Sequence, residues 1–263
     1  MADSRNDLTV ASAVERSARA NGQRIAYTFV RDAQPEAEHI TYAELDARAA
    51  ALALRLNRQG LAAQPVLVMC PAGFDYAVAL LACWRAGAIA VPAYPPTRTN
   101  AARAVPRLRA IVADARARVA LTTSDVRNVA MGFDLGGLEL TVVDGETGVS
   151  DGTEAGVYGD PDSAAILQYT SGSTSTPKGV LLTHAQLVAN QQMSCASSNI
   201  TGDDVFVSWL PPYHDMGLMG GVVLPLFTGG RGVLMTPDAF IRKPLRWLTT
   251  IAEHRASVLM APN

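Results

Sequence analysis

Short apolar runs alternate with segments of helical periodicity along most of the chain. Leu45, Ala49, Leu52 and Leu56 follow one another at spacings of four, three and four, which is typical of one face of a helix. Further helices are expected at 74–86, from 184 to about 197, and at 245–254. Strands are expected at 66–69, 89–91, 119–122, 164–169, 205–210, 233–235 and 258–260. Strands that alternate with helices predict an α/β fold with mostly parallel sheets and covering helices.

The ends of these segments carry further signals. Thr41 and Glu44 have the spacing of a capping box ahead of the first helix, and Gly60 is expected to end that helix. The polar interval 144–162 is rich in Gly and Asp and is the best candidate for a linker or mobile loop. We therefore expect a first lobe over 1–145, a linker or loop over 146–161 and a second lobe over 162–263.

Composition narrows the class of protein. With 49% hydrophobic and 17% charged residues, the 263-residue chain can bury a substantial core. Its net charge of −2 gives no electrostatic reason to expect nucleic acid or an anionic membrane as a partner. The start of the chain lacks the apolar core of a signal peptide, and the longest uncharged stretch, 216–230, is shorter than the roughly 20 residues that span a bilayer. A cytoplasmic protein without a membrane span is expected.

The cysteines and most histidines are expected to have structural roles. The cysteines lie in apolar contexts without metal-like spacing, as core thiols do: Cys70, Cys83 and Cys195. Three histidines stand near the ends of expected elements, where capping or solvent exposure is the simpler interpretation: His39, His184 and His254.

The segment from Tyr169 to Gly179 carries the clearest chemistry. It reads Tyr-Thr-Ser-Gly-Ser-Thr-Ser-Thr-Pro-Lys-Gly and lies between two apolar runs, so a strand–turn–strand arrangement is expected. Glycine lets backbone N–H groups approach a ligand closely, hydroxyls donate hydrogen bonds, and the lysine adds a full positive charge. These groups favour phosphate binding over the alternative, an ordinary Ser/Thr/Gly turn. The candidate ligands are Thr170, Ser171, Gly172, Ser173, Thr174, Thr176, Lys178 and Gly179.

A second informative string covers 207–218 and reads Val-Ser-Trp-Leu-Pro-Pro-Tyr-His-Asp-Met-Gly-Leu. The 169–179 segment resembles the phosphate-binding loop of the adenylate-forming superfamily, with Ser175 where that superfamily usually has glycine. Together the two strings resemble the fatty acyl-AMP ligases, and the segments 40–45 and 86–92 are similar to the superfamily as a whole. The resemblance implies the large N-terminal domain of an adenylate-forming enzyme, with ATP and Mg²⁺ as cofactors.

The resemblance also implies an activity and roles for individual residues. A long-chain fatty acid would be converted to its acyl-adenylate and passed to an acyl carrier protein in polyketide, nonribosomal peptide or lipid synthesis. His214 would contact the phosphate or the carboxylate in catalysis; the alternative is a core histidine after a proline-terminated strand. The residues implied at the acyl pocket are Trp209, Tyr213, Asp215, Met216, Gly217 and Leu218. For Trp209, core packing is an equal alternative.

No metal ligand is assigned from the sequence. His214 and Asp215 are adjacent, and in an extended segment their side chains would point to opposite sides. Magnesium would instead bridge phosphate oxygens of the nucleotide.

Two alternatives to this reading stay open: a CoA-dependent acyl ligase, and a non-catalytic nucleotide- or acyl-binding module. In the resembled family the N-terminal domain continues beyond the length of this chain and a small C-terminal lid domain follows. We therefore expect a truncated chain that lacks the lid domain and is inactive by itself.

Overall fold

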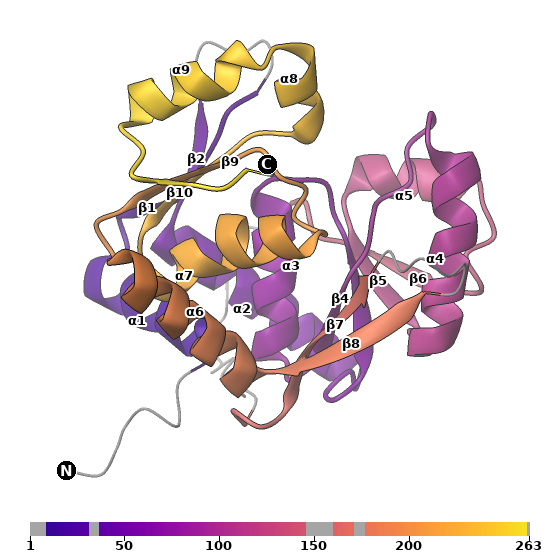
Figure 1. The fold of residues 1–263 in the computed structure, drawn as a ribbon. Helices are drawn as coiled ribbons and strands as arrows, with labels where there is room; N and C mark the ends of the chain where they lie inside the picture. The colour runs from indigo at the N-terminus through magenta and orange to yellow at the C-terminus, as the bar shows by residue number, and fades with distance from the viewer. Residues whose placement is uncertain (1–8, 32–36, 146–159, 171–176, 262–263) are drawn as a thin grey trace. The chain divides into compact units, whose positions relative to one another are not determined.

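The computed structural model describes residues 9–31, 37–145, 160–170 and 177–261 (Figure 1). These residues divide into two compact units. The first unit comprises Met1–Asp46, Ala72–Phe74 and Ala185–Asn263, and the second comprises Ala47–Pro71 and Asp75–His184. The strands on either side of the 146–161 interval belong to one sheet, which lies in the second unit.

The second unit contains a six-stranded sheet in the order β6-β5-β3-β4-β7-β8. Its strands are β3 (Pro65–Met69), β4 (Ile89–Pro92), β5 (Val119–Thr122), β6 (Glu139–Val142), β7 (Ala164–Thr170) and β8 (Lys178–Thr183). All neighbouring pairs are parallel except β7 and β8, which form an antiparallel hairpin. Its helices are the greater part of α2 (Tyr42–Arg58), α3 (Phe74–Arg85), α4 (Ala101–Ala115) and α5 (Ser124–Ala130).

The core of the second unit lies between this sheet and the helices α4 and α5. One cluster of buried residues joins β3 and β5 to the apolar face of α4, and it includes Leu67, Leu108, Ile111, Val112 and Tyr169. Helix α3 is buried over nearly its whole length, which explains why its sequence is apolar on every side. Cys70 and Cys83 are buried, as expected of core thiols, whereas Cys195 is only partly buried.

The first unit contains a five-stranded sheet in the order β11-β9-β10-β1-β2. Its strands are β1 (Ile25–Phe29), β2 (Glu38–Thr41), β9 (Val205–Ser208), β10 (Arg231–Leu234) and β11 (Val258–Leu259). Only the β1–β2 pair is antiparallel. Its helices are α1 (Val10–Asn21), α6 (His184–Ser198), the π-helix η1 (Gly217–Val223), α7 (Leu224–Thr228), α8 (Pro237–Arg242) and α9 (Leu245–His254).

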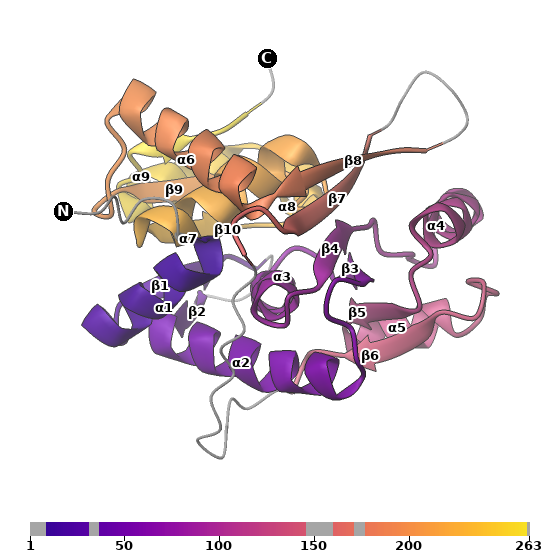
Figure 2. The same cartoon turned by 90° about the horizontal axis from the view of Figure 1, so that it is seen from below.

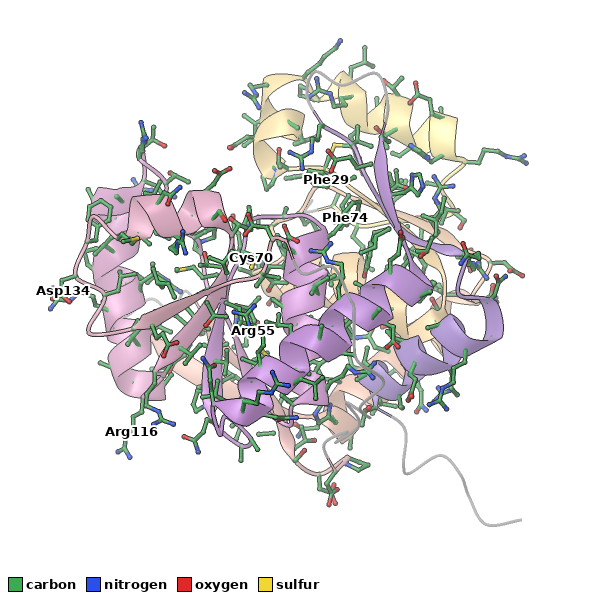
Figure 3. The ribbon with its side chains drawn as sticks, turned by 180° about the vertical axis from the view of Figure 1, so that it is seen from behind. Phe29, Arg55, Cys70, Phe74, Arg116 and Asp134 are labelled. Atoms are coloured by element: carbon green, nitrogen blue, oxygen red, sulfur yellow. The ribbon has the colours of Figure 1, made fainter. Side chains whose placement is uncertain are left out.

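Aromatic side chains hold the first unit together. The hydroxyl of Tyr27 donates to the carbonyl of Val222 at 2.6 Å, and that of Tyr42 donates to the carbonyl of Gly230 at 2.8 Å. Both rings are buried, and burial raises the pKa of each phenol, so both hydroxyls remain donors at neutral pH. Phe29 and Phe74, both labelled in Figure 3, pack edge to face, and their ring centroids are 6.2 Å apart.

The α/β fold with mostly parallel sheets is confirmed. So is the capping box: the amide of Thr41 donates to Glu44 Oε2 at 2.8 Å, and the amide of Glu44 donates to Thr41 Oγ1 at 3.2 Å. Every strand and helix expected from the pattern is present with bounds that agree within two residues at each end. None of the described helices is long and apolar enough to cross a membrane.

Candidate functional site

The segment 169–179, called the phosphate-loop segment below, includes the facing ends of β7 and β8 in the second unit. Thr170 is paired with Lys178, and Tyr169 with Gly179, so the described residues on either side of 171–176 form two antiparallel strands, as expected (Figure 2). Both Thr170 and Lys178 are exposed, which leaves the hydroxyl and the ammonium group accessible to a ligand. Of the candidate phosphate ligands, five lie outside the described residues: Ser171, Gly172, Ser173, Thr174 and Thr176.

Gly179 has a packing role that the sequence did not indicate. A Cβ atom built on this glycine would lie 2.8 Å from Leu167 Cδ1 and 3.3 Å from Tyr169 Cζ. The ring of Tyr169 therefore crosses the hairpin from β7 and lies against the backbone of β8. Glycine leaves room here for the side chains of Leu167 and Tyr169 on the neighbouring strand.

Helix α4 contributes two contacts to the base of the hairpin. The hydroxyl of Tyr169 donates to Asp114 Oδ2 at 2.5 Å, and Arg107 Nη2 donates to the carbonyl of Thr170 at 3.4 Å. Burial of the phenol and its hydrogen bond to Asp114 raise the pKa of Tyr169, so this group remains protonated and serves as a donor. Arg107 and Asp114 were not predicted as site residues, because nothing in a charged helical segment marks which residues face a distant strand.

The His214 segment belongs to the first unit and is not extended. His214 lies in a turn after Pro211 and Pro212, with its amide bonded to the carbonyl of Pro211 at 3.1 Å, and helical backbone begins at Asp215. His214 Nδ1 lies 2.6 Å from Asp215 Oδ1. The expectation that these two side chains point to opposite sides is therefore wrong, because it assumed strand geometry where the prolines produce a turn.

This pairing leaves one face of the imidazole accessible. His214 is 63% exposed and Asp215 is 70% exposed. Asp215 Oδ1 also accepts from the amide of Met216 at 2.7 Å, so the carboxylate is held in place at the start of the helix. A carboxylate at Nδ1 orients the ring and leaves Nε2 as the nitrogen that a ligand can meet.

The residues after His214 that are predicted to line an acyl pocket separate into buried and exposed positions. Met216 is 42% exposed, whereas Leu218 is fully buried in the π-helix η1. Gly217 allows close packing, because a Cβ atom there would lie 2.2 Å from the carbonyl oxygen of Pro211. Gly217 also borders a small cavity of about 10 Å³, which has room for about one water molecule.

Trp209 follows β9 and belongs to an aromatic cluster. Its ring stacks on Phe240 with centroids 3.9 Å apart and an interplanar angle of 10°. Phe240 in turn meets Trp247 edge to face at 6.0 Å. The indole nitrogens of both tryptophans are buried, and neither has a hydrogen-bond partner among the described residues. The structure thus gives Trp209 a packing role. A contact between Trp209 and an acyl chain stays a prediction.

Two other histidines differ from the sequence expectation of capping or exposure. His184 is buried against Trp84, with ring centroids 6.1 Å apart, and burial lowers the pKa of its imidazole to about 4. His254 Nδ1 lies 2.6 Å from Arg231 Nη2, and burial together with this cation lowers the pKa of His254.

No group of three or more His, Cys, Asp or Glu that could hold a metal ion occurs among residues 9–31, 37–145, 160–170 and 177–261. No described residue is assigned as a ligand of Mg²⁺.

Known proteins are similar to this chain in both sequence and fold. A medium-chain-fatty-acid–[acyl-carrier-protein] ligase, JamA, from Moorena producens is 36% identical over 247 residues, which cover 91% of this chain and 42% of that protein. A long-chain-fatty-acid–AMP ligase, FadD26, from Mycobacterium marinum is 33% identical over 273 residues, with 98% of this chain and 46% of that protein covered.

A solved structure agrees with these relatives. The crystal structure of a fatty acyl-adenylate ligase from L. pneumophila, in complex with acyl adenylate and pyrophosphate, matches with a TM-score of 0.86 at 28% identity, over 97% of this chain and 44% of that one. The chain therefore spans less than half the length of the relatives it matches. The family model for "AMP-binding enzyme" matches residues 14–263, and the chain belongs to that family.

Proposed function

We propose that this chain carries the ATP-binding part, and a portion of the acyl pocket, of an enzyme that converts a long-chain fatty acid to its acyl-adenylate for transfer to an acyl carrier protein. The observation that carries the proposal is the β7–β8 hairpin, which presents Lys178 opposite Thr170 at the base of a hydroxyl-rich segment. Membership of the AMP-binding family and relatives named as fatty-acid ligases support it. A cytoplasmic location is part of the same proposal.

The reaction needs positioning more than acid–base chemistry. A carboxylate oxygen of the fatty acid attacks the α-phosphorus of ATP, the bond from that phosphorus to the bridging oxygen breaks, and pyrophosphate leaves. Because a fatty acid is already ionised at neutral pH, no base is needed to activate it. Lys178 would neutralise charge on the β- and γ-phosphates, and the hydroxyl of Thr170 would donate to them.

His214 is proposed as the residue that meets the reacting end of the substrate. Asp215 holds the proton on Nδ1, so a ring that carries both protons donates from Nε2 to a phosphate or carboxylate oxygen. Trp209, Tyr213, Met216 and the residues of η1 that follow are proposed to line the acyl side. Magnesium would arrive with the nucleotide, and no step is assigned to it.

The test uses the two lysines of the chain, Lys178 and Lys243, which are both exposed. An amine-reactive reagent should modify both in the absence of ligand, as read by mass spectrometry of peptides. Saturating ATP should slow the modification of Lys178 several-fold and leave Lys243 unchanged. Equal rates at Lys178 with and without ATP would contradict the proposal, and equal slowing of both lysines would indicate only non-specific anion binding.

The acceptor is tested separately on the longer protein. Pre-formed acyl-adenylate should acylate a carrier protein that bears a phosphopantetheine arm, and should react slowly or not at all with free CoA. The reverse preference would support the CoA-dependent acyl ligase.

A further inference from the structure

The end of the β7–β8 hairpin that carries Thr170 and Lys178 has few backbone hydrogen bonds to the rest of its sheet. In the described part of the chain, ladder pairing between β7 and β4 is confined to Ala90 and Ile166. The hairpin continues for four residues beyond that pair, to Thr170. On the other side, β8 is an edge strand, and residues 178–181 are all exposed. A two-stranded hairpin that extends past its sheet is marginally stable unless something else packs against it.

Helix α4 supplies that support from a single face. Arg107 and Asp114 are seven residues apart, which is two helical turns, so they lie on nearly the same side of α4 and about 10 Å apart along its axis. Asp114 binds the hydroxyl of Tyr169, and Arg107 binds the carbonyl of Thr170. These are the last two residues of β7, directly before the hydroxyl-rich segment.

The contact reaches both arms of the hairpin. Tyr169 is 5% exposed and belongs to the same buried cluster as Leu108, Ile111 and Val112 of α4. Its ring also lies against the backbone of Gly179 on the opposite strand. Fixing this ring therefore fixes Thr170 on β7 and the neighbourhood of Lys178 on β8 together.

We propose that Asp114 and Arg107 are positioning residues for nucleotide binding, which act by anchoring Tyr169 and Thr170 and so hold the Thr170–Lys178 pair in place for the phosphates. This inference rests on the proposed function. It assigns a task to α4, whose charged residues otherwise resemble an ordinary solvated helix face. The side chains of Asp114 and Arg107 act through the hairpin and need not touch the nucleotide.

The first test measures ATP affinity in variants of this chain. Tyr169→Phe, Asp114→Asn and Arg107→Gln should each weaken ATP binding roughly three- to tenfold, which corresponds to the loss of about one hydrogen bond. Tyr169→Phe combined with Asp114→Asn should be no weaker than either alone, because both remove the same bond. Arg107→Lys should restore most of the affinity, since lysine can still donate to the carbonyl.

A matched control lies on the same helix. Arg109 is two residues from Arg107, is exposed, and pairs with Asp134 at 3.3 Å instead of with the hairpin (Figure 3 labels Asp134). Arg109→Gln removes the same charge from α4 and should leave ATP affinity unchanged. If Arg109→Gln and Arg107→Gln weaken binding equally, the effect is general electrostatics and the positioning role is wrong.

The second test measures the local stability of the hairpin in the absence of ATP. Hydrogen–deuterium exchange of peptides that cover 166–170 and 178–182 should speed up in Tyr169→Phe and Asp114→Asn, with no change in Arg109→Gln. Unchanged exchange and unchanged affinity would overturn the inference, and so would faster exchange with unchanged affinity. If the wild-type chain binds no ATP and ATP does not protect Lys178 from modification, the proposed function fails, and the positioning role fails with it. If ATP protects Lys178 but these variants bind ATP normally, only the positioning role fails.

Discussion

At the scale of single residues, charge and exposure decide what Lys178 can do. It is exposed, it is the first residue of β8, and it faces the strand that enters the phosphate-loop segment. An ammonium group there keeps its hydration until a polyanion displaces the water, so its contribution should appear in nucleotide binding and not in stability.

Replacing Lys178 should therefore affect ATP specifically. Lys178→Ala is expected to weaken ATP use by about 1.5–3 kcal/mol, or roughly ten- to a hundredfold, because a charge-assisted hydrogen bond is lost. The midpoint of urea unfolding should not change. Lys243→Ala is the control, since it removes the other lysine and should alter neither quantity. An ATP affinity of Lys178→Ala equal to that of the wild type would remove Lys178 from the site.

His184 makes stability depend on pH. Burial lowers the pKa of its imidazole to about 4, below the unfolded value of about 6.5. Below pH 6.5 the unfolded chain takes up a proton that the folded chain does not, so the free energy of unfolding falls as the pH decreases from about 6.5 to about 4. Between pH 7.5 and 5 the loss from this residue should be about 2 kcal/mol.

The comparison variant for this pH effect is His184→Phe. It keeps an aromatic ring against Trp84, and His184 Nδ1 has no hydrogen-bond partner to lose in the part of the chain that the structure describes. Urea unfolding at pH 7.5 and pH 5 should show a smaller loss of stability in His184→Phe than in the wild type. The same loss in both proteins would mean that other groups cause the pH dependence.

At the scale of elements, two glycines of the π-helix η1 that follows β9 have different neighbours. A Cβ atom on Gly217 would lie 2.2 Å from the backbone carbonyl oxygen of Pro211, which cannot move without breaking the turn that holds His214. A Cβ atom on Gly220 would lie 1.5 Å from Met260 Sδ, near the far end of a flexible side chain.

Substitution by alanine should separate these two positions. Gly217→Ala is expected to destabilise the chain by about 2–3 kcal/mol, because the backbone of Pro211 must shift. Gly220→Ala should change stability by less than about 1 kcal/mol, since the Met260 side chain can rotate away and alanine favours helix. Urea denaturation measures both. Equal losses in the two variants would show that the contact with Pro211 does not determine this turn.

The pattern predicted the elements whose boundaries are marked by residues within or next to the element itself. The helix over 42–58 has its capping box and the helix over 245–254 has its clear apolar face, and both begin within a residue of the expected position. The π-helix was not predicted, because Gly217–Val223 is apolar all round and its geometry depends on packing against β9. The turn at His214 was not predicted either, because its backbone conformation depends on the position of Pro211 and leaves no signal in the hydrophobic periodicity.

At the scale of the whole molecule, sequence could predict the two candidate groups but not the units to which they belong. The hairpin with Lys178 lies in the unit Ala47–Pro71 and Asp75–His184, and His214 lies in the other. The chain passes between the units several times, and Ala72–Phe74 belongs to the first although its neighbours belong to the second. Such a division depends on contacts between distant segments, which one-dimensional periodicity does not record. The expected lobes over 1–145 and 162–263 stay a prediction.

The last prediction concerns completeness of the catalytic apparatus. This chain spans 42% and 46% of the two relatives described above, so it can be compared with a longer protein that also carries the remaining portion. ATP–pyrophosphate exchange needs every group that positions the carboxylate against the α-phosphorus, since a small loss of alignment reduces the rate by orders of magnitude. The 263-residue chain should thus bind ATP but catalyse no exchange with a long-chain fatty acid, whereas a longer protein with the remaining portion should catalyse it. Lys178→Ala in the longer protein should reduce the exchange at subsaturating ATP. Robust exchange by the 263-residue chain would show that these residues already contain the complete adenylation site.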